Sequence, residues 1–390
     1  MKKIKVLHIN ESLCIGGREN MILEFCNHLN YNKFDVSLLT LDKDLTLKDK
    51  LNNHISLLNL NYKRNDLKAL NLFFKHITFI RQIGNILKKG KYDIIHLHSY
   101  ASIHFFISIA IFLYAKNVPV VKTIHTSGLH YASNSLSNKF RRLLEIVATK
   151  MCKTHLIAIS QTVYTKAILY FNKYAQSINL IYNGKDLNPF KKDCPNILKK
   201  EESDIIGIYS ARIVNGKNHM FLINIWKVLK ERGKNNIKLY LAGDGDNLTF
   251  LKKYINKEGL SDSIICLGYC NNVPEILLQS DFAVFPSEYE GFSIALIEKL
   301  AAGLPVICSK IPPFEEVINN NHNGFIIDIK NKKAWIDCIE KISMNKKLRE
   351  RIGFNAKLKS EDFSIEKMIN KYEILYSEIV FNNQITTYRK

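Results

Sequence analysis

The chain has 390 residues, of which 46% are hydrophobic and 24% charged, so it is long enough for two ordinary domains and is not a disordered protein. Its formal net charge is +20, and residues 1–190, with 26 Lys and Arg against 11 Asp and Glu, hold most of this excess. The eight Cys residues form no Cys-x-x-Cys pair, which favours reduced core thiols in a cytoplasmic protein over disulfides or a zinc site. Residues 1–10 are basic and then apolar, but the apolar run is too short for a signal peptide and predicts a buried strand.

Short apolar runs recur along the first half of the chain. Helical patterns fall between most of them, which predicts a parallel, doubly wound sheet. The uncharged stretch 94–115 is long enough to span a bilayer, but its His and Ser residues and its division into a strand and a helix favour the interior of an α/β domain. The predicted strands of this half are Ile4–Ile9, Phe34–Leu41, Ile55–Leu58, Ile94–His98, Val120–His125 and Leu156–Ile159.

The positive charge of the first half allows several interpretations. Residues 67–89 predict a basic amphipathic helix, which would either lie on an anionic inner-membrane surface or pack on its own sheet. Lys-rich codon usage would account for the charge excess equally well. A nucleic-acid-binding protein has charge alone in its favour, without a basic-aromatic motif or a helix-turn-helix pattern, so no nucleic-acid partner is expected.

The second half repeats the same rhythm of strands and helices. A boundary is predicted at residues 183–190, which are followed by the charged stretch 191–204. The predicted strands are Ile205–Tyr209, Ile237–Ala242, Ile264–Leu267, Phe282–Phe285, Val306–Ser309 and Gly324–Ile327, and the predicted helices are Met220–Glu231, Leu248–Lys257, Val273–Gln279 and Phe292–Ala302.

Two carboxylates flank the start of the helix predicted from Phe292. Glu290 lies at the turn after the preceding strand, where Gly291 gives the backbone freedom, and Glu298 lies within the helix, about 12 Å further along its axis at about 1.5 Å per residue. The helix N-terminus between them favours phosphate. A diphosphate with a sugar at each end fits this layout, with Glu290 at one sugar and Glu298 at a nucleoside ribose. The alternative is that Glu290 only caps the helix and Glu298 is solvated.

The block from Asp281 to Ile307 resembles the signature of the retaining glycosyltransferases of family 4, which are two-domain GT-B enzymes that use nucleotide-sugar donors. The resemblance implies two Rossmann-like, doubly wound α/β domains that face a central cleft. It assigns residues 1–185 to an acceptor-binding domain and residues 186–364 to a donor-binding domain. The last helix, predicted at about residues 365–381, would cross back to the first domain, within residues 365–390.

The resemblance also implies roles for particular residues. His125, at the end of a strand, would lie beside the transferred sugar, and Glu290 is the main catalytic candidate. Arg212 and Lys217 would bind the donor diphosphate and stabilise it as it leaves. The remaining donor-binding candidates are Glu298, Gly291, Phe292, Ser293, Ile294 and Gly17, and the nucleobase candidates are Gly268, Tyr269, Asn271 and Val273.

The implied activity is that of a retaining hexosyltransferase. It would move a hexose or N-acetylhexosamine from a nucleoside-diphosphate sugar, with UDP as the expected carrier, to a hydroxyl of a glycan or lipid-linked glycan in capsule or exopolysaccharide synthesis. No cofactor and no metal are expected, because the two D-x-D motifs, Asp42–Asp44 and Asp244–Asp246, are joined by no further acidic or His cluster. The alternatives are another GT-B sugar-nucleotide enzyme, either an epimerase or a phosphorylase, and a non-catalytic sugar-nucleotide-binding subunit.

Overall fold

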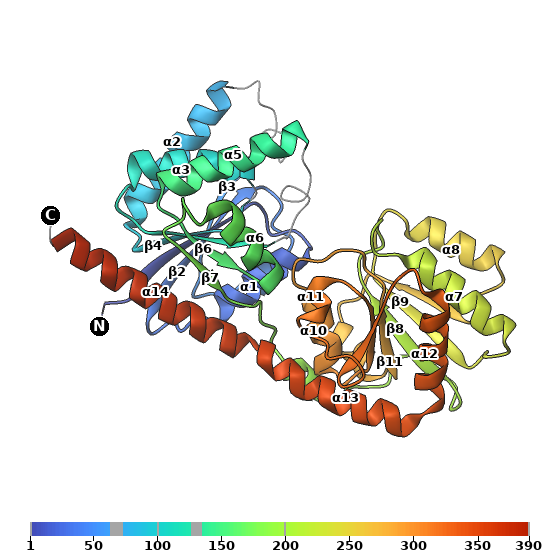
Figure 1. Ribbon diagram of the computed structural model, residues 1–390. Coiled ribbons are helices and arrows are strands. Elements are labelled where there is room, and N and C mark those ends of the chain that lie inside the picture. The colour runs from blue at the N-terminus through green and yellow to red at the C-terminus, as the bar shows by residue number, and fades with distance from the viewer. Residues whose placement is uncertain (1, 63–72, 100, 126–134, 199, 389–390) are drawn as a thin grey trace. The chain divides into compact units, whose positions relative to one another are not determined.

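The computed structural model describes residues 2–62, 73–99, 101–125, 135–198 and 200–388 (Figure 1). The chain forms two compact units. The first comprises Met1–Gly184 together with Ile365–Lys390, and the second comprises Lys185–Ser364. Each unit is built on its own parallel β-sheet, so the predicted pair of Rossmann-like α/β folds is confirmed.

The sheet of the first unit has seven parallel strands in the order β3-β2-β1-β4-β5-β6-β7. Six of them lie where the sequence predicts them, within two residues at nearly every end. The seventh, β7, was not predicted, because its four residues Ser-Ile-Asn-Leu are too few and too polar to form a recognisable apolar run. The strands are β1 (Ile4–Asn10), β2 (Phe34–Asp42), β3 (Ser56–Tyr62), β4 (Ile94–Leu97), β5 (Val120–Ile124), β6 (His155–Ala158) and β7 (Ser177–Leu180).

Helices cover both faces of this sheet. Successive residues of a strand point to opposite faces, so Val6 packs with α1 and α14 while Leu7 packs with α2 and α3 (Figure 1). The helices of this unit are α1 (Gly17–His28), α2 (Phe73–Gly90), α3 (Ala101–Tyr114), α5 (Leu136–Met151), α6 (Gln161–Phe171) and α14 (Ile365–Tyr388), with a 3₁₀ turn η1 (Lys48–Lys50).

The described part of the predicted basic amphipathic helix is α2, and residues 67–72 of that prediction lie outside the described residues. Phe79, Ile83 and Leu87, spaced four residues apart, are buried in the core with α3. This part of the helix therefore packs on its own sheet, which is the second of the two interpretations of the sequence. No helix in the part of the chain that the structure describes is long and apolar enough to cross a bilayer.

The second unit has a six-stranded parallel sheet in the order β10-β9-β8-β11-β12-β13, and every one of these strands was predicted. The strands are β8 (Ile205–Ser210), β9 (Ile237–Ala242), β10 (Ile264–Gly268), β11 (Phe282–Phe285), β12 (Val306–Ser309) and β13 (Gly324–Ile327). The helices are α7 (His219–Glu231), α8 (Leu248–Lys257), α9 (Val273–Leu278), α10 (Ile294–Ala301), α11 (Pro312–Glu315), α12 (Lys332–Met344) and α13 (Lys346–Ser360), with 3₁₀ turns η2 (Asn188–Lys191) and η3 (Glu361–Phe363).

Each sheet contains one point at which the strand order reverses. In the first unit it lies between β1 and β4, and in the second it lies between β8 and β11. In open parallel sheets the connections at such a point leave to opposite faces, and ligands bind in the crevice outside the carboxyl ends of the two strands. The loops after β8 and β11 are therefore where a ligand of the second unit is expected.

Candidate active site

Lys217 and Glu290 come together at the switch point of the second unit. Lys217 lies in the loop after β8, Glu290 lies in the loop after β11, and the Lys217 Nζ is 2.5 Å from a carboxylate oxygen of Glu290. Both side chains are partly buried, with exposed fractions of 24% and 14%. Two residues that the sequence assigned separately to a diphosphate and to a sugar thus form one ion pair.

Hydrogen bonds between the two loops hold this pair in place. The backbone N–H of Glu288 donates to the carbonyl of Gly216 at 3.2 Å, and the Asn218 side-chain amide donates to the carbonyl of Pro286 at 2.9 Å. The buried Tyr209 donates its hydroxyl hydrogen to the carbonyl of Lys217 at 2.8 Å. Each side of the pair is therefore fixed by backbone contacts rather than by the ion pair alone.

The helix after Glu290 begins two residues later than predicted. Ser293 is its N-cap, with extended backbone, and Ile294 is its first helical residue, while Phe292 and Ser293 are buried. Glu290 is consequently not the N-cap residue, so the alternative in which it only caps the helix is wrong. Gly291 is not among the described glycines with positive φ, so the turn does not depend on the backbone freedom expected there. At the other end, Ala302 is the C-cap, and Gly303 after it has φ +73°, the left-handed backbone that commonly ends a helix.

Glu298 lies within α10, as predicted, and it has a partner that the sequence did not indicate. Its carboxylate is 3.3 Å from the Nζ of Lys185, and both side chains are about four-fifths buried. Lys185 comes from the segment that opens the second unit, 113 residues earlier in the chain. Nothing in the local pattern around Lys185 would have found this pair.

Lys299, which lies in α10, is a second cation that the sequence did not indicate, and it is fully buried. Its Nζ donates to the Ser210 hydroxyl at 2.7 Å and to the Ala295 carbonyl at 3.1 Å, and it lies over the Phe285 ring. Burial lowers the pKa of Lys299 to about 8, although Glu298 and Glu290 act in the opposite direction. Lys299 therefore ties α10 to the end of β8, two residues before Arg212.

Arg212 is exposed just beyond β8, in the loop that also carries Lys217. Backbone hydrogen bonds join this loop to the one after β9, since Ile213 donates to Asp244 at 2.9 Å. Gly243, in the loop after β9, lies so close to the loop after β8 that an added Cβ would be 1.9 Å from the Ala211 carbonyl oxygen. Contacts with the loop after β9 therefore fix the backbone of the loop that carries both Arg212 and Lys217.

The proposed nucleobase residues lie on the next loop of the same edge. The Gly243 N–H donates to the carbonyl of Gly268, which has φ +73°. Tyr269 and Asn271 are exposed, and Val273 is the first residue of α9. These four residues therefore run from the end of β10 to the start of α9, beside the loop after β9. In the part of the chain that the structure describes, no hydrogen bond or ion pair joins them to Glu298.

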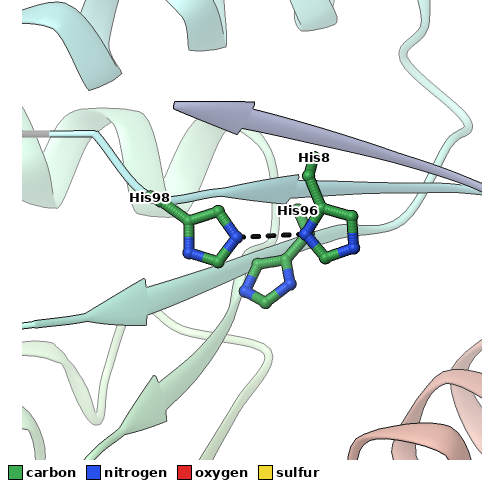
Figure 2. Close-up of side chains that lie close together, drawn as sticks. All are labelled: His8, His96 and His98. Carbon is green, nitrogen blue, oxygen red and sulfur yellow. Dashed lines mark hydrogen bonds between the residues drawn. The ribbon is translucent and has the colours of Figure 1, made fainter. Parts of the chain in front are cut away.

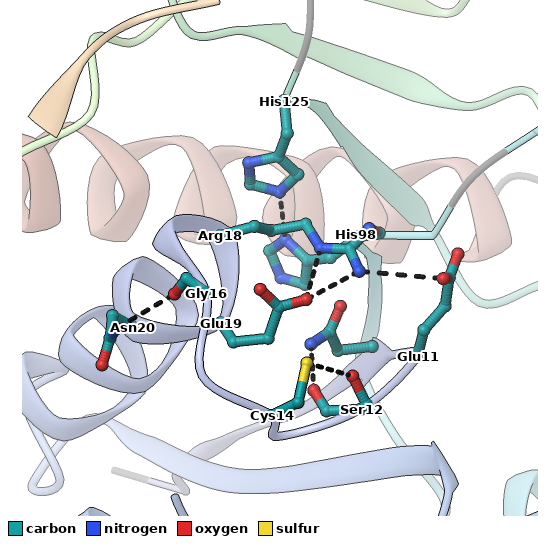
Figure 3. A network of polar contacts seen from close by, with 10 residues as sticks. Glu11, Ser12, Cys14, Gly16, Arg18, Glu19, Asn20, His98 and His125 are labelled. Carbon is teal, nitrogen blue, oxygen red and sulfur yellow. Dashed lines mark hydrogen bonds and ion pairs between the residues drawn. The ribbon is translucent and has the colours of Figure 1, made fainter. Parts of the chain in front are cut away.

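In the first unit, polar side chains gather at the switch point between β1 and β4 (Figure 3). The Arg18 guanidinium donates to the Glu19 carboxylate at 2.8 Å, is 3.7 Å from the Glu11 carboxylate, and also reaches the carbonyl of His98. All three charged side chains are largely buried. The sequence did not single out Glu11, in the loop after β1, or Arg18 and Glu19, in the first turn of α1, because single charges carry no local signal.

His125 ends a row of three imidazoles that runs into the sheet. Its Nε2 is 3.1 Å from the Nδ1 of His98, and the Nε2 of His98 is 3.1 Å from the Nδ1 of His8 (Figures 2 and 3). Burial lowers the pKa of His125 to about 3, with smaller effects from Arg18 and Lys122, and it lowers the pKa of His8 to about 3 as well. These rings are neutral at pH 7, so each has one nitrogen that can donate a hydrogen bond and one that can accept.

His8, His96 and His98 are the one group within the described ranges whose ligand atoms are close enough for a metal ion (Figure 2). The nitrogens of His96 already face hydroxyls, with Nδ1 2.5 Å from Tyr376 and Nε2 2.8 Å from Thr123. A metal ion would have to displace these hydrogen bonds and place its charge in a core without a carboxylate in the group. The hydrogen-bonded arrangement fits the three rings better than a metal centre does.

The carboxylates of both D-x-D motifs accept hydrogen bonds from backbone N–H groups within their own loops. Asp42 and Asp44 each accept a backbone N–H two residues further on, and the Asp244 carboxylate accepts the Gly245 N–H at 2.7 Å. Gly17 is the exposed first residue of α1, and an added Cβ there would meet open space. At Gly16 an added Cβ would lie 2.3 Å from a carboxylate oxygen of Glu19, so the Glu19 side chain would have to shift.

Comparison with known proteins identifies the family. The model described as "Glycosyltransferase Family 4" matches residues 15–189, and that described as "Glycosyl transferases group 1" matches residues 190–359. The chain is 27% identical to the UDP-Gal:alpha-D-GlcNAc-diphosphoundecaprenol alpha-1,3-galactosyltransferase of Escherichia coli, over 97% of this chain and 98% of the relative. It is also 27% identical to the capsular polysaccharide biosynthesis glycosyltransferase CapH of Staphylococcus aureus, over 90% and 93% of the two chains.

Solved structures share the fold. Anabaena HepE in complex with UDP has a TM-score of 0.75 at 17% identity, covering 96% of this chain and 100% of that one. A glycosyltransferase from Rickettsia africae has a TM-score of 0.78 at 21% identity, covering 97% and 99%. The two family matches leave only residues 1–14 and 360–390 outside, and the paired parallel sheets agree with these neighbours. The chain therefore belongs to the group 1 glycosyl transferases of glycosyltransferase family 4.

Proposed function

We propose that this protein is a retaining, metal-independent glycosyltransferase that moves a hexose or N-acetylhexosamine from a nucleoside-diphosphate sugar to a hydroxyl of a glycan or lipid-linked glycan. The observation that carries the proposal is the Lys217–Glu290 pair at the β8/β11 switch point, just before the N-terminus of α10. UDP is the proposed carrier. It is supported by a relative whose name includes UDP-Gal and by a structural neighbour in complex with UDP.

The ion pair suggests how the donor would engage the site. A diphosphate carries more negative charge than a carboxylate and competes with Glu290 for the Lys217 ammonium, with Arg212 on the same loop as a second cation. Glu290 would then be free to accept hydrogen bonds from the sugar hydroxyls. Glu298 would accept hydrogen bonds from the ribose, with Lys185 holding its carboxylate in place.

The reaction breaks the bond between the anomeric carbon and the diphosphate oxygen. Arg212, Lys217 and the N-terminus of α10 stabilise the charge that develops on the leaving group. The sugar becomes oxocarbenium-like, the acceptor hydroxyl attacks from the face that the diphosphate leaves, and its proton passes to a diphosphate oxygen. The configuration at the anomeric carbon is retained, and Glu290 positions the sugar without forming a bond to it.

The first unit would supply the acceptor side. His125 is partly buried and neutral at pH 7, so it can offer a hydrogen bond to a sugar hydroxyl without adding charge. The names of two relatives, a diphosphoundecaprenol galactosyltransferase and a capsular polysaccharide glycosyltransferase, support a lipid-linked glycan acceptor in cell-surface polysaccharide synthesis.

A thermal-shift panel of nucleoside diphosphates without metal tests the donor site. A ligand that binds only the folded state stabilises it, by about 2.7 kcal/mol when its concentration is a hundred times Kd, and so raises the melting temperature. We expect UDP to stabilise the protein, and Glu298→Ala to lose that effect. Glu258→Ala is the matched control, because Glu258 pairs with Lys227 on the same unit but away from α10. Stabilisation by UDP that survives in Glu298→Ala would place the nucleotide elsewhere.

A further inference from the structure

Helix α5 carries four large apolar side chains on its solvent side. Leu136, Phe140, Leu143 and Val147 have exposed fractions of 85%, 51%, 55% and 42%. They are spaced four, three and four residues apart, so they form one stripe within an arc of about 60° on the helix. Isolated exposed leucines are ordinary on a protein surface, whereas a continuous stripe of this kind marks an interaction site.

The opposite side of α5 is the one that the protein buries, and it is largely polar. Glu145, Ala148 and Thr149 are buried there. The Glu145 carboxylate pairs with the ammonium group of Lys122 on β5, and the His104 ring lies 3.0 Å from the same ammonium. A buried ion pair thus fixes the rotation of the helix and turns its more apolar side outward, the reverse of an ordinary surface helix.

The exposed charges of α5 itself are all positive. Within α5, Glu145 is the sole carboxylate, and it is buried against Lys122, whereas Lys139, Arg141 and Lys150 are exposed. By helical position, Lys139 and Lys150 flank the apolar stripe on one side. The helix therefore presents apolar side chains edged by cations, within a unit where residues 1–190 hold most of the protein's positive excess.

We propose that the outward face of α5, defined by Leu136, Phe140, Leu143 and Val147 with Lys139 and Lys150, lies in the interface of an anionic lipid surface. Its apolar side chains enter the headgroup–acyl boundary, and its cations contact lipid phosphates. A second copy of the chain is a poor occupant, because pairing two such faces would bring like charges together. An acidic protein would match the charge at one spot, but the broad positive excess of residues 1–190 suits an extended anionic surface better.

Vesicle sedimentation with the full chain tests this surface. We expect binding to phosphatidylglycerol vesicles that weakens with salt, and little binding to phosphatidylcholine vesicles. Phe140→Ser with Leu143→Ser should weaken binding by at least about tenfold, since two exposed anchors are lost. Lys139→Glu with Lys150→Glu should weaken it on anionic vesicles and reduce the salt dependence.

The matched control is Phe354→Ser with Leu358→Ser, an equally exposed apolar pair on α13 of the other unit. This control should bind vesicles like the unchanged protein. Equal loss in the control, unchanged binding in the α5 variants, or equal binding to neutral vesicles would overturn the proposal. So would light scattering that shows an α5-dependent dimer in the absence of lipid. No α5 residue belongs to the donor site, so UDP stabilisation and vesicle binding can fail separately.

Discussion

At the scale of single residues, the proposed donor site consists of charges that already have partners. Lys217 is held by Glu290, Glu298 by Lys185, and Lys299 by Ser210 and Ala295. Unpaired buried charges would be costly, and these contacts remove that cost. In the proposed mechanism the donor diphosphate therefore competes with these partners for the site's charges.

Replacing Lys217 or Glu290 by Ala should remove sugar transfer while leaving the fold intact. In the proposed mechanism each group acts on the reacting centre, where one such interaction is worth about 10²–10³ in rate. A partly exposed ion pair, in contrast, contributes only about 1 kcal/mol to stability. Turnover of labelled donor and the melting temperature measure the two effects. Lys227→Ala, which breaks the exposed Lys227–Glu258 pair, is the control. Near-normal turnover in both variants would contradict the proposed mechanism.

Lys299 should make donor affinity fall at alkaline pH. Because burial lowers the pKa of Lys299 to about 8, this side chain loses its charge above pH 8, and the site becomes less attractive to a diphosphate. Between pH 8 and its ordinary value of 10.5 the unfolded chain holds the extra proton, so the free energy of unfolding should rise with pH over this window. Calorimetric titration of UDP at pH 7 and 9.5 measures the affinity. Lys299→Met should abolish the difference in UDP affinity between the two pH values. If the difference is unchanged in this variant, another titrating group causes it.

At the scale of elements, α14 returns the end of the chain to the first unit. Its residues Ile369, Tyr372 and Tyr376 are buried in the same core as Phe25 of α1, and the Tyr372 ring lies 4.5 Å from that of Phe25. The sequence predicts the helix from its apolar pattern, but only the resemblance implied where it packs. Contacts between segments more than 300 residues apart leave no trace in a local pattern.

Truncating Ile369 to Ala should destabilise the first unit by about 2–4 kcal/mol, because it removes buried methyl groups and leaves a cavity. Ile374→Ala is the matched control on the same helix, where the side chain is half-exposed, and it should change stability little. Urea unfolding of both variants measures the difference. Equal stability of the two variants would show that α14 contributes no packing to this unit.

Most elements of the fold could be predicted because each has its own periodicity. Twelve of the thirteen strands in the described part of the chain were predicted, and the missing one, β7, has only four half-buried residues. Helices α12 and α13 were not named, since their charged residues obscure the apolar face. The start of α10 was placed two residues early, because Phe292 is apolar and buried without being helical.

At the scale of the whole molecule, buried neutral histidines should make the first unit acid-sensitive. The pKa values of His8 and His125 lie near 3 in the folded protein and near 6.5 when exposed, so below pH 6.5 the unfolded chain binds protons that the folded chain does not. The free energy of unfolding should fall as pH falls, by about 2–3 kcal/mol for each of these two residues at pH 4.5. Urea unfolding at pH 7, 6 and 5 measures the slope, and a flat profile would contradict the buried, neutral assignment.

The sequence by itself determined the class of fold and the family. Alternating apolar runs and helical patterns are local, and they specify two parallel sheets whose carboxyl edges carry Arg212, Glu290 and His125. It also placed Glu290 before a helix N-terminus and Glu298 inside the helix, because a strand, a turn and a helix follow one another within a few residues.

Only the tertiary structure decided which side chains meet. Lys217 and Glu290 are 73 residues apart and His8 and His98 are 90 apart, and the order of strands in the sheet brings each pair together. The outward rotation of α5 was equally hidden, since an apolar stripe looks the same whether it faces a core or a solvent. The physical reason is that periodicity tells which face of an element is apolar, whereas burial of Glu145 against Lys122 decides which face is turned inward.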